Sequence, residues 1–157
     1  PESDWPYVIN VQRNIGPMGL PLTKPPYRRI TAIDLNTGEH VWQTAFGKGP
    51  ANHPLLEHLN LPDLGSVFTD VSAEGGILIT EGLVISHLPQ KDEVNEDADG
   101  SILVAYDKLT GDKVGEVTVD RRLHGPVMSY LSGGKQYIAI AGGRFDTAEM
   151  ISFALPD

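Results

Sequence analysis

The sequence predicts an all-β chain, and two observations carry that prediction. The first is a segment that occurs twice: residues 32–42 (AIDLNTGEHVW) return 73 positions later as residues 105–115 (AYDKLTGDKVG), with Ala, Asp, Thr, Gly and Val at matching places. The second is that Gly and Pro make up 29 of 157 residues, about 18% against a usual ~12%. Short repeated units and frequent turn residues are typical of strands joined by tight turns.

Each copy of the repeat is predicted to form a strand, a tight turn and a second strand. In the pattern Asp-x-x-Thr-Gly, the Asp carboxylate and the Thr hydroxyl can accept hydrogen bonds from backbone N–H groups of the turn, and Gly can adopt a positive φ. An aromatic side chain after the turn can bury a large area between two packed sheets. The residues expected to form this docking motif are Ala32, Asp34, Thr37, Gly38, Trp42, Ala105, Asp107, Thr110 and Gly111.

The rest of the chain alternates between β-rich runs and loops, and residues 1–157 are expected to form a single all-β domain. The expected strands are residues 5–11, 30–35, 40–46, 77–80, 83–87, 102–107, 114–119, 127–131, 136–141 and 150–155. The expected loops are a Pro/Gly loop at 14–29, a connecting loop at 47–75 with a short helix at 55–59, and an acidic insertion at 88–100.

Composition excludes several classes of function. With 21 acidic and 12 basic residues the formal net charge is −9, so nucleic acid and anionic membrane surfaces would repel the chain. The absence of Cys excludes disulfides, thiolate metal sites and cysteine nucleophiles within this sequence. No apolar run approaches the ~18 residues of a membrane-spanning helix, and no signal peptide is recognised.

A family resemblance runs from about residue 16 to the last residue. It rests on the first repeat together with residues 19–27 (GLPLTKPPY), 75–85 (GGILITEGLVI), 125–143 (GPVMSYLSGGKQYIAIAGG) and 153–157 (FALPD). These stretches resemble the C-terminal region of quinoprotein dehydrogenases, in particular the membrane-bound glucose dehydrogenase type that uses pyrroloquinoline quinone (PQQ). The resemblance implies a partial β-propeller, in which a C-terminal fragment supplies two to three four-stranded antiparallel blades of an eight-bladed ring.

The same resemblance implies a periplasmic oxidoreductase that transfers hydride from a sugar or alcohol to PQQ, with Ca²⁺ acting beside the quinone on the propeller axis. The catalytic base and the Ca²⁺ ligands would lie upstream of residue 1. We therefore expect no catalytic or metal-binding residue in this chain, no cofactor bound to it and no activity of the chain alone. Its partners would be the rest of the propeller or further copies of itself, because open blade faces and edge strands need cover.

Two short stretches correspond to family positions beside the quinone, and both depart from the family pattern. Alcohol-oxidising relatives have a Trp that stacks on the quinone where Glu74 precedes Gly75, and Glu cannot stack. In the second stretch, Gly142, Gly143 and Arg144, the Arg could pair with a quinone carboxylate. The alternative is that the two glycines are only a strand-ending turn and the Arg is a solvated charge. The departures also permit a relative that has lost cofactor binding.

Other polar clusters give weaker signals. Residues 95–106 begin like a Ca²⁺-binding loop, but Tyr106 stands where the closing acidic ligand belongs, so an acidic solvated insertion is favoured. His53, Glu57 and His58 do not share one helical face and indicate a surface loop. The remaining histidines are expected to be structural, with His40 packing beside Trp42: His40, His87 and His124.

Two other functions remain open on the sequence. One is a non-catalytic propeller scaffold that resembles the outer-membrane assembly lipoproteins, which share the docking repeat and bind peptides. The other is a small β domain that acts through self-association. The stretches 19–27 and 153–157 favour the dehydrogenase, because the scaffold proteins are not expected to carry them.

Overall fold

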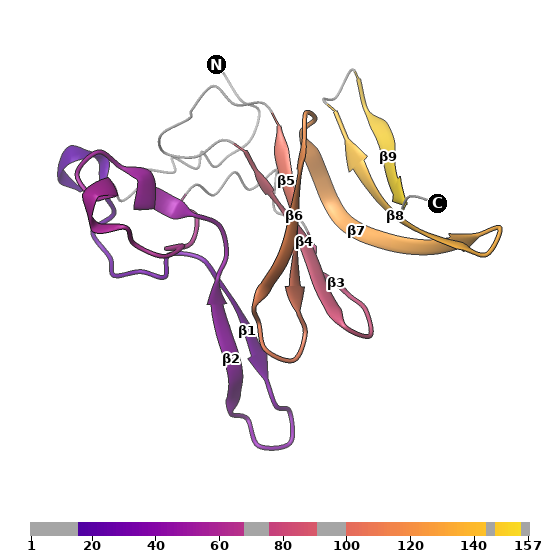
Figure 1. The fold of residues 1–157 in the computed structure, drawn as a ribbon, viewed down its shortest axis with the longest axis horizontal. Coiled ribbons are helices and arrows are strands. Elements are labelled where there is room, and N and C mark those ends of the chain that lie inside the picture. Colours follow the sequence, from indigo (N-terminus) through magenta and orange to yellow (C-terminus); the bar gives the residue numbers. More distant parts are fainter. Residues whose placement is uncertain (1–15, 68–75, 91–99, 144–146, 155–157) are drawn as a thin grey trace, which may run out of the picture.

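The computed structural model describes residues 16–67, 76–90, 100–143 and 147–154 (Figure 1). These residues form three antiparallel sheets, which confirms the all-β prediction. The first sheet pairs β1 (Arg29–Ile33) with β2 (His40–Ala45). The second has the order β3 (Leu78–Ile79), β4 (Leu83–Pro89), β5 (Ser101–Asp107) and β6 (Lys113–Val119). The third has the order β7 (Leu123–Ser132), β8 (Lys135–Gly142) and β9 (Glu149–Ala154).

The sheets pack face to face, as the blades of a propeller do, and the described sheets do not close into a ring (Figure 1). The second sheet is a complete four-stranded blade, while the described part of the first has two strands and that of the third has three. Helical structure in the described residues is limited to three short 3₁₀ turns: η1 (Pro17–Gly19), η2 (Gly49–Asn52) and η3 (Glu57–Leu59). The last of these lies within the short helix expected at 55–59.

Most predicted strands agree with the observed ones to within two residues, and two boundaries differ. The acidic insertion was expected to start at residue 88, but β4 continues to Pro89, where it pairs with Ser101. The strand expected at 127–131 begins at Leu123 instead, because β7 contains an irregularity between His124 and Met128 that the sequence suggests is a turn. The strand expected at residues 5–11 lies outside the described residues.

The turn between β1 and β2 is held by its own polar groups. Asp34 Oδ1 accepts a hydrogen bond from Asn36 N–H at 2.8 Å, and Thr37 Oγ1 accepts one from Glu39 N–H at 3.2 Å. The backbone closes the loop with a 2.7 Å bond from Gly38 N–H to the Asp34 carbonyl, and Gly38 has φ +76°. These are the bonds for which an Asp-x-x-Thr-Gly turn is suited.

The turn between β5 and β6 has the same construction. Asp107 Oδ1 accepts hydrogen bonds from Leu109 N–H at 2.8 Å and Thr110 N–H at 3.0 Å, and Thr110 Oγ1 accepts one from Asp112 N–H at 3.2 Å. Gly111 has φ +78° and donates to the Asp107 carbonyl at 2.9 Å. Each repeat also has a register shift in the strand before its turn, so the two copies form the same supersecondary unit.

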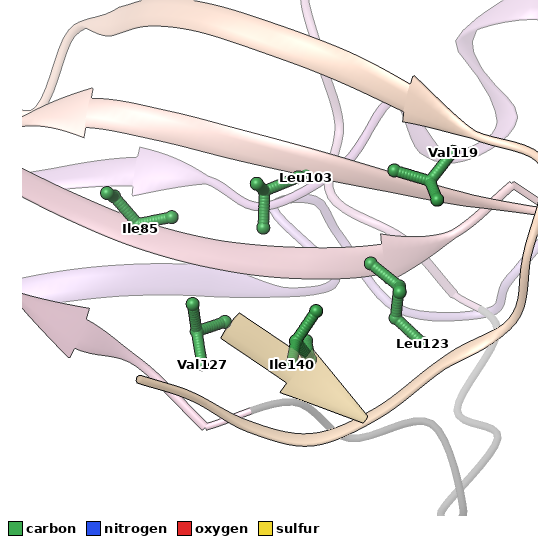
Figure 2. Close-up of a cluster of buried hydrophobic side chains, with 6 residues drawn as sticks. All are labelled: Ile85, Leu103, Val119, Leu123, Val127 and Ile140. Carbon is green, nitrogen blue, oxygen red and sulfur yellow. The ribbon is translucent and has the colours of Figure 1, made fainter. Parts of the chain in front are cut away.

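The middle sheet is apolar on both faces, because successive strand residues point to opposite sides. Val84 and Val104 point toward the first sheet, while their neighbours Ile85 and Leu103 point toward the third. The cluster on the first side consists of Phe46, Val84, Leu88, Val104 and Tyr106, with Ile30 and Trp42 packed against it. The cluster on the other side consists of Ile85, Leu103, Val119, Leu123, Val127 and Ile140 (Figure 2).

Trp42 joins the first sheet to the turn of the second repeat. Its indole Nε1 donates a 2.9 Å hydrogen bond to the Lys108 carbonyl. Its ring lies against Gly111 so closely that a Cβ at that position would be 2.5 Å from Trp42 Cε3. The indole is half-buried, so the contact combines apolar packing with a directed hydrogen bond.

The contact between the second and third sheets is made differently. Gly115 stands where the first repeat has Trp42, and a Cβ there would meet nothing within 4 Å. Two polar contacts accompany the Leu/Ile/Val cluster: Ser101 Oγ accepts a hydrogen bond from Leu123 N–H at 2.9 Å, and the His87 ring bonds the Gly125 carbonyl. The repeats are therefore alike in their turns and different in their contacts with the next sheet.

A comparison of two glycine substitutions tests the Trp42 contact. Gly38→Ala and Gly111→Ala both place a side chain at a positive φ, which costs about 1–2 kcal/mol. Gly38 has no atom near the added Cβ, whereas at Gly111 the Cβ meets Trp42, and this overlap should add about 1–3 kcal/mol. Urea unfolding should show Gly111→Ala as the more destabilising variant.

The same pair in a Trp42→Ala background completes a double-mutant cycle. Without the indole, Gly38→Ala and Gly111→Ala should lower the free energy of unfolding by the same amount. An extra cost at Gly111 that survives removal of the indole would contradict the contact described here.

Candidate functional site

The two stretches predicted to lie beside a cofactor are only partly described. Glu74, Gly75 and Arg144 lie outside the described residues, whereas Gly142 and Gly143 lie within them. Gly76, which follows the first stretch directly, is also described. The structure therefore shows the contacts of Gly76, which follows the first stretch, and of Gly142 and Gly143, which belong to the second.

Gly76 is packed against the beginning of β7. A Cβ at this position would lie 2.9 Å from Pro126 Cβ, so the Gly76 backbone and the proline ring are in direct contact. The buried Ser86 hydroxyl donates to the Gly76 carbonyl at 3.3 Å. A glycine is needed here because any side chain would push the segment away from β7.

Gly142 is the last residue of β8, and Gly143 follows it. A Cβ on Gly142 would lie 2.6 Å from Ile151 Cδ1, and one on Gly143 would overlap the Thr147 carbonyl. Gly143 has φ +92°, donates its N–H to the Arg122 carbonyl at 2.9 Å, and accepts a hydrogen bond from His124 Nε2 at 2.9 Å. Packing alone is therefore enough to require glycine at both positions, as in the alternative that the two glycines are only a strand-ending turn. Both backbone polar groups of Gly143 are occupied by these hydrogen bonds.

His87 is the most deeply buried titratable side chain near these stretches, with 1% of its surface exposed. Its Nε2 lies 3.0 Å from the Gly125 carbonyl and must carry the proton, since a carbonyl oxygen can only accept. Its Nδ1 is buried and has no hydrogen-bond partner among the described residues. Burial lowers the pKa of His87, as do the nearby charges of His124 and Arg28, while the bond to Gly125 opposes this shift.

His53 and His40 differ in their contacts and surroundings. His53 uses both ring nitrogens in contacts between and within loops: Nε2 lies 3.1 Å from the Met18 carbonyl in the Pro/Gly loop, and Nδ1 lies 3.2 Å from Leu55 N, which agrees with a surface-loop role. The expectation that His40 packs beside Trp42 is wrong: His40 pairs with Ile33 after the register shift in β1, and its side chain is exposed.

Two further features of the described segments are negative findings. They contain no group of three or more His, Asp or Glu side chains that could hold a metal ion. The helices in these segments are also all too short and too polar to cross a membrane.

A pocket lies between the connecting loop and strands β4, β5 and β6 of the middle sheet, and its lining includes a group of ion pairs. Lys113 Nζ lies 3.3 Å from Asp63 Oδ2 and 3.4 Å from Glu116 Oε2. Burial, followed by the charges of Asp63 and Glu116, raises the pKa of Tyr106 to about 12, so its phenol remains protonated at neutral pH. These four side chains of the pocket therefore provide neither an activated nucleophile nor an unpaired base.

The contacts that sequence reasoning missed are backbone ones. The partners of Trp42, His87, His124 and Gly143 are carbonyl groups, which every residue carries and no side-chain pattern marks. The available signal was the dipeptide Gly125-Pro126, which was interpreted as part of a family motif and not as an anchor for the stretch that ends at Gly76.

The lowered pKa of His87 predicts a pH-dependent stability. The unfolded chain protonates His87 near pH 6.5 and the folded chain only at lower pH, so the unfolded state binds more protons between the two values. The free energy of unfolding should therefore fall as the pH drops below 6.5, by about 1.4 kcal/mol for each unit of pKa lowering.

The measurement is urea unfolding at several pH values between 7.5 and 5. His87→Gln, which keeps a donor near the Nε2 position, should flatten the dependence, and His40→Gln at an exposed site should not. Equal pH slopes for His87→Gln and the unchanged chain would refute the assignment.

Comparison with known proteins identifies the family. The family described as PQQ glucose/ethanol/alcohol dehydrogenase, beta-propeller domain, matches residues 1–138. The chain is 30% identical over 158 residues to quinoprotein glucose dehydrogenase A of Acinetobacter calcoaceticus, covering 97% of this chain and 18% of that protein. It is 29% identical over 164 residues to a probable quinate dehydrogenase (quinone) of Xanthomonas campestris pv. juglandis, covering 100% of this chain and 19% of that protein.

A third relative is the glycerol dehydrogenase large subunit of Gluconobacter oxydans, 31% identical over 147 residues, covering 88% of this chain and 18% of that protein. The chain thus spans about a fifth of the length of the curated relatives it matches. Since the family match extends over most of the sequence and the described residues form antiparallel sheets packed face to face, this chain belongs to the PQQ-dependent dehydrogenase β-propeller family.

Proposed function

We propose that this chain is a C-terminal portion of the propeller of a PQQ-dependent dehydrogenase, that the complete protein oxidises a sugar or other polyol in the periplasm, and that the chain is inactive alone. The observation that carries the proposal is the family match over residues 1–138. The names of the relatives support the substrate class, because glucose, quinate and glycerol all carry several hydroxyl groups.

In this proposal the chain contributes structure and one side of the cofactor site. PQQ, when bound, would accept the hydride of the substrate. Of the described residues, Gly76 and Gly143 adjoin the two candidate stretches, and both are anchored to β7 by tight contacts suited to a rigid wall. The described residues fit that partial role, and Ca²⁺ ligands would have to come from elsewhere in the complete protein.

The rest of the propeller is the proposed partner, with further copies of this chain as the alternative. Large apolar side chains are exposed on the outer sheets: Ile33 and Val41 on the first, and Met128, Tyr130, Leu131 and Met150 on the third. Within the chain, sheets cover such residues by stacking face to face. Neighbouring blades would cover the outer ones in the same way.

A chimeric enzyme tests the proposal. The aligned segment of the Acinetobacter calcoaceticus glucose dehydrogenase is replaced by this chain, and PQQ-dependent reduction of a dye by glucose is measured. We expect the chimera to regain activity that is lost when the segment is deleted. Trp42→Ala should lower this activity because it loosens the contact between blades, and Leu35→Ala, at a side chain that is 94% exposed, should not.

A chimera that folds, as judged by circular dichroism, and yet binds no PQQ would refute the proposal. A complementary titration uses the chain alone with PQQ and Ca²⁺, and we expect no binding tighter than millimolar because most of the cofactor's walls are absent. A micromolar complex would show that the chain is a self-sufficient cofactor domain.

A further inference from the structure

Two glycine stretches from different sheets meet at one short segment. Gly76 precedes the middle sheet and Gly143 directly follows β8 in the third sheet, and both contact residues 122–126, which run from the residue before β7 into that strand. Gly76 packs on Pro126, while Gly143 bonds the Arg122 carbonyl and the His124 ring. A five-residue segment therefore sets where both stretches lie.

The backbone of this segment is shaped for the task. The β7–β8 pairing is interrupted between His124 and Met128, and Gly125 has φ +71°. The interruption releases the Gly125 carbonyl from the β ladder, so that it can accept the hydrogen bond from His87 on β4. The segment is thereby tied to the middle sheet through His87 and to the end of β8 through His124.

Each imidazole makes its contact through the same ring nitrogen. Both His87 Nε2 and His124 Nε2 face carbonyl oxygens, at 3.0 and 2.9 Å, so in each ring Nε2 carries the proton. His124 spans from β7 to the Gly143 carbonyl, which otherwise would have to find another donor. A side chain without a donor at position 124 would leave this carbonyl free to move.

We propose that residues 122–126 form a clamp that fixes the two glycine stretches relative to each other, and that His124 is the positioning residue on the Gly143 side. The proposal rests on the function proposed above, since the stretches are the ones that the family resemblance places beside the quinone. His124 acts through Gly143 and is not itself a catalytic residue.

The first test uses the chain alone and needs no cofactor. Amide hydrogen exchange at Gly143, whose N–H donates to the Arg122 carbonyl, should accelerate about tenfold in His124→Ala, because the turn loses its second anchor. His124→Gln, which keeps a donor near Nε2, should restore slow exchange. His40→Ala, at an exposed position, should leave it unchanged. Nitrogen NMR should show a proton on Nε2 of His124 in the unchanged chain.

The second test uses the chimeric glucose dehydrogenase. His124→Ala should raise the PQQ concentration needed for half-maximal reconstitution about tenfold, the scale of an outer-shell effect, and should change kcat at saturating PQQ much less. His124→Gln should reverse the effect and His40→Ala should not produce it. An inactive chimera carrying the unchanged chain would count against the proposed function alone.

Two outcomes overturn the clamp. One is unchanged exchange at Gly143 in His124→Ala. The other is an active chimera whose PQQ half-saturation does not respond to His124→Ala. A uniform fall in kcat and in thermal stability, without a change in PQQ half-saturation, would show that His124 supports the fold in general and would equally reject the positioning role.

Discussion

The constraint on which the structure depends is that the middle sheet is apolar on both faces. Val84 and Ile85 are neighbours on β4, yet each belongs to a different buried cluster, and Leu103 and Val104 on β5 repeat the arrangement. A sheet of this kind is stable only between two others, since either exposed face would present a row of aliphatic side chains to water. The stacking of sheets therefore follows from the alternation within single strands.

The two repeats show how one turn can serve two purposes. Gly38 and Gly111 occupy equivalent positions and both have positive φ, but only Gly111 lies against an indole. Gly111 is thus required twice, once by its own backbone and once by Trp42 of the preceding unit. Because Gly115 replaces the indole in the second repeat, the next contact relies on aliphatic packing, Ser101 and His87.

Local chemistry made the turns and most strands predictable, because the Asp and Thr side chains, the positive φ of Gly and a period-two apolar pattern act within a few residues. The start of β7 was missed because Gly125-Pro126 is typical of a turn, and here it forms an irregularity inside a strand. His40 was misplaced because the β1–β2 register shifts between Trp42 and His40, with Val41 as the extra residue, and the His40 side chain is exposed. Of the candidate site, the glycine stretches remain a prediction from the sequence, and their anchors could not be predicted because backbone carbonyls leave no signature in a sequence.

The anchors explain how a chain with few polar groups near its candidate site can still shape it. A ligand wall needs fixed positions more than it needs charges, and here the fixed positions come from hydrogen bonds to main-chain carbonyls, one between the second and third sheets and one within the third sheet. His87 and His124 donate these bonds. The His87 bond ends on the Gly125 carbonyl in the irregular start of β7, and the His124 bond runs from the same segment to the Gly143 carbonyl. The face-to-face packing that stabilises the fold and the geometry of the candidate site therefore depend on the same seam between the second and third sheets.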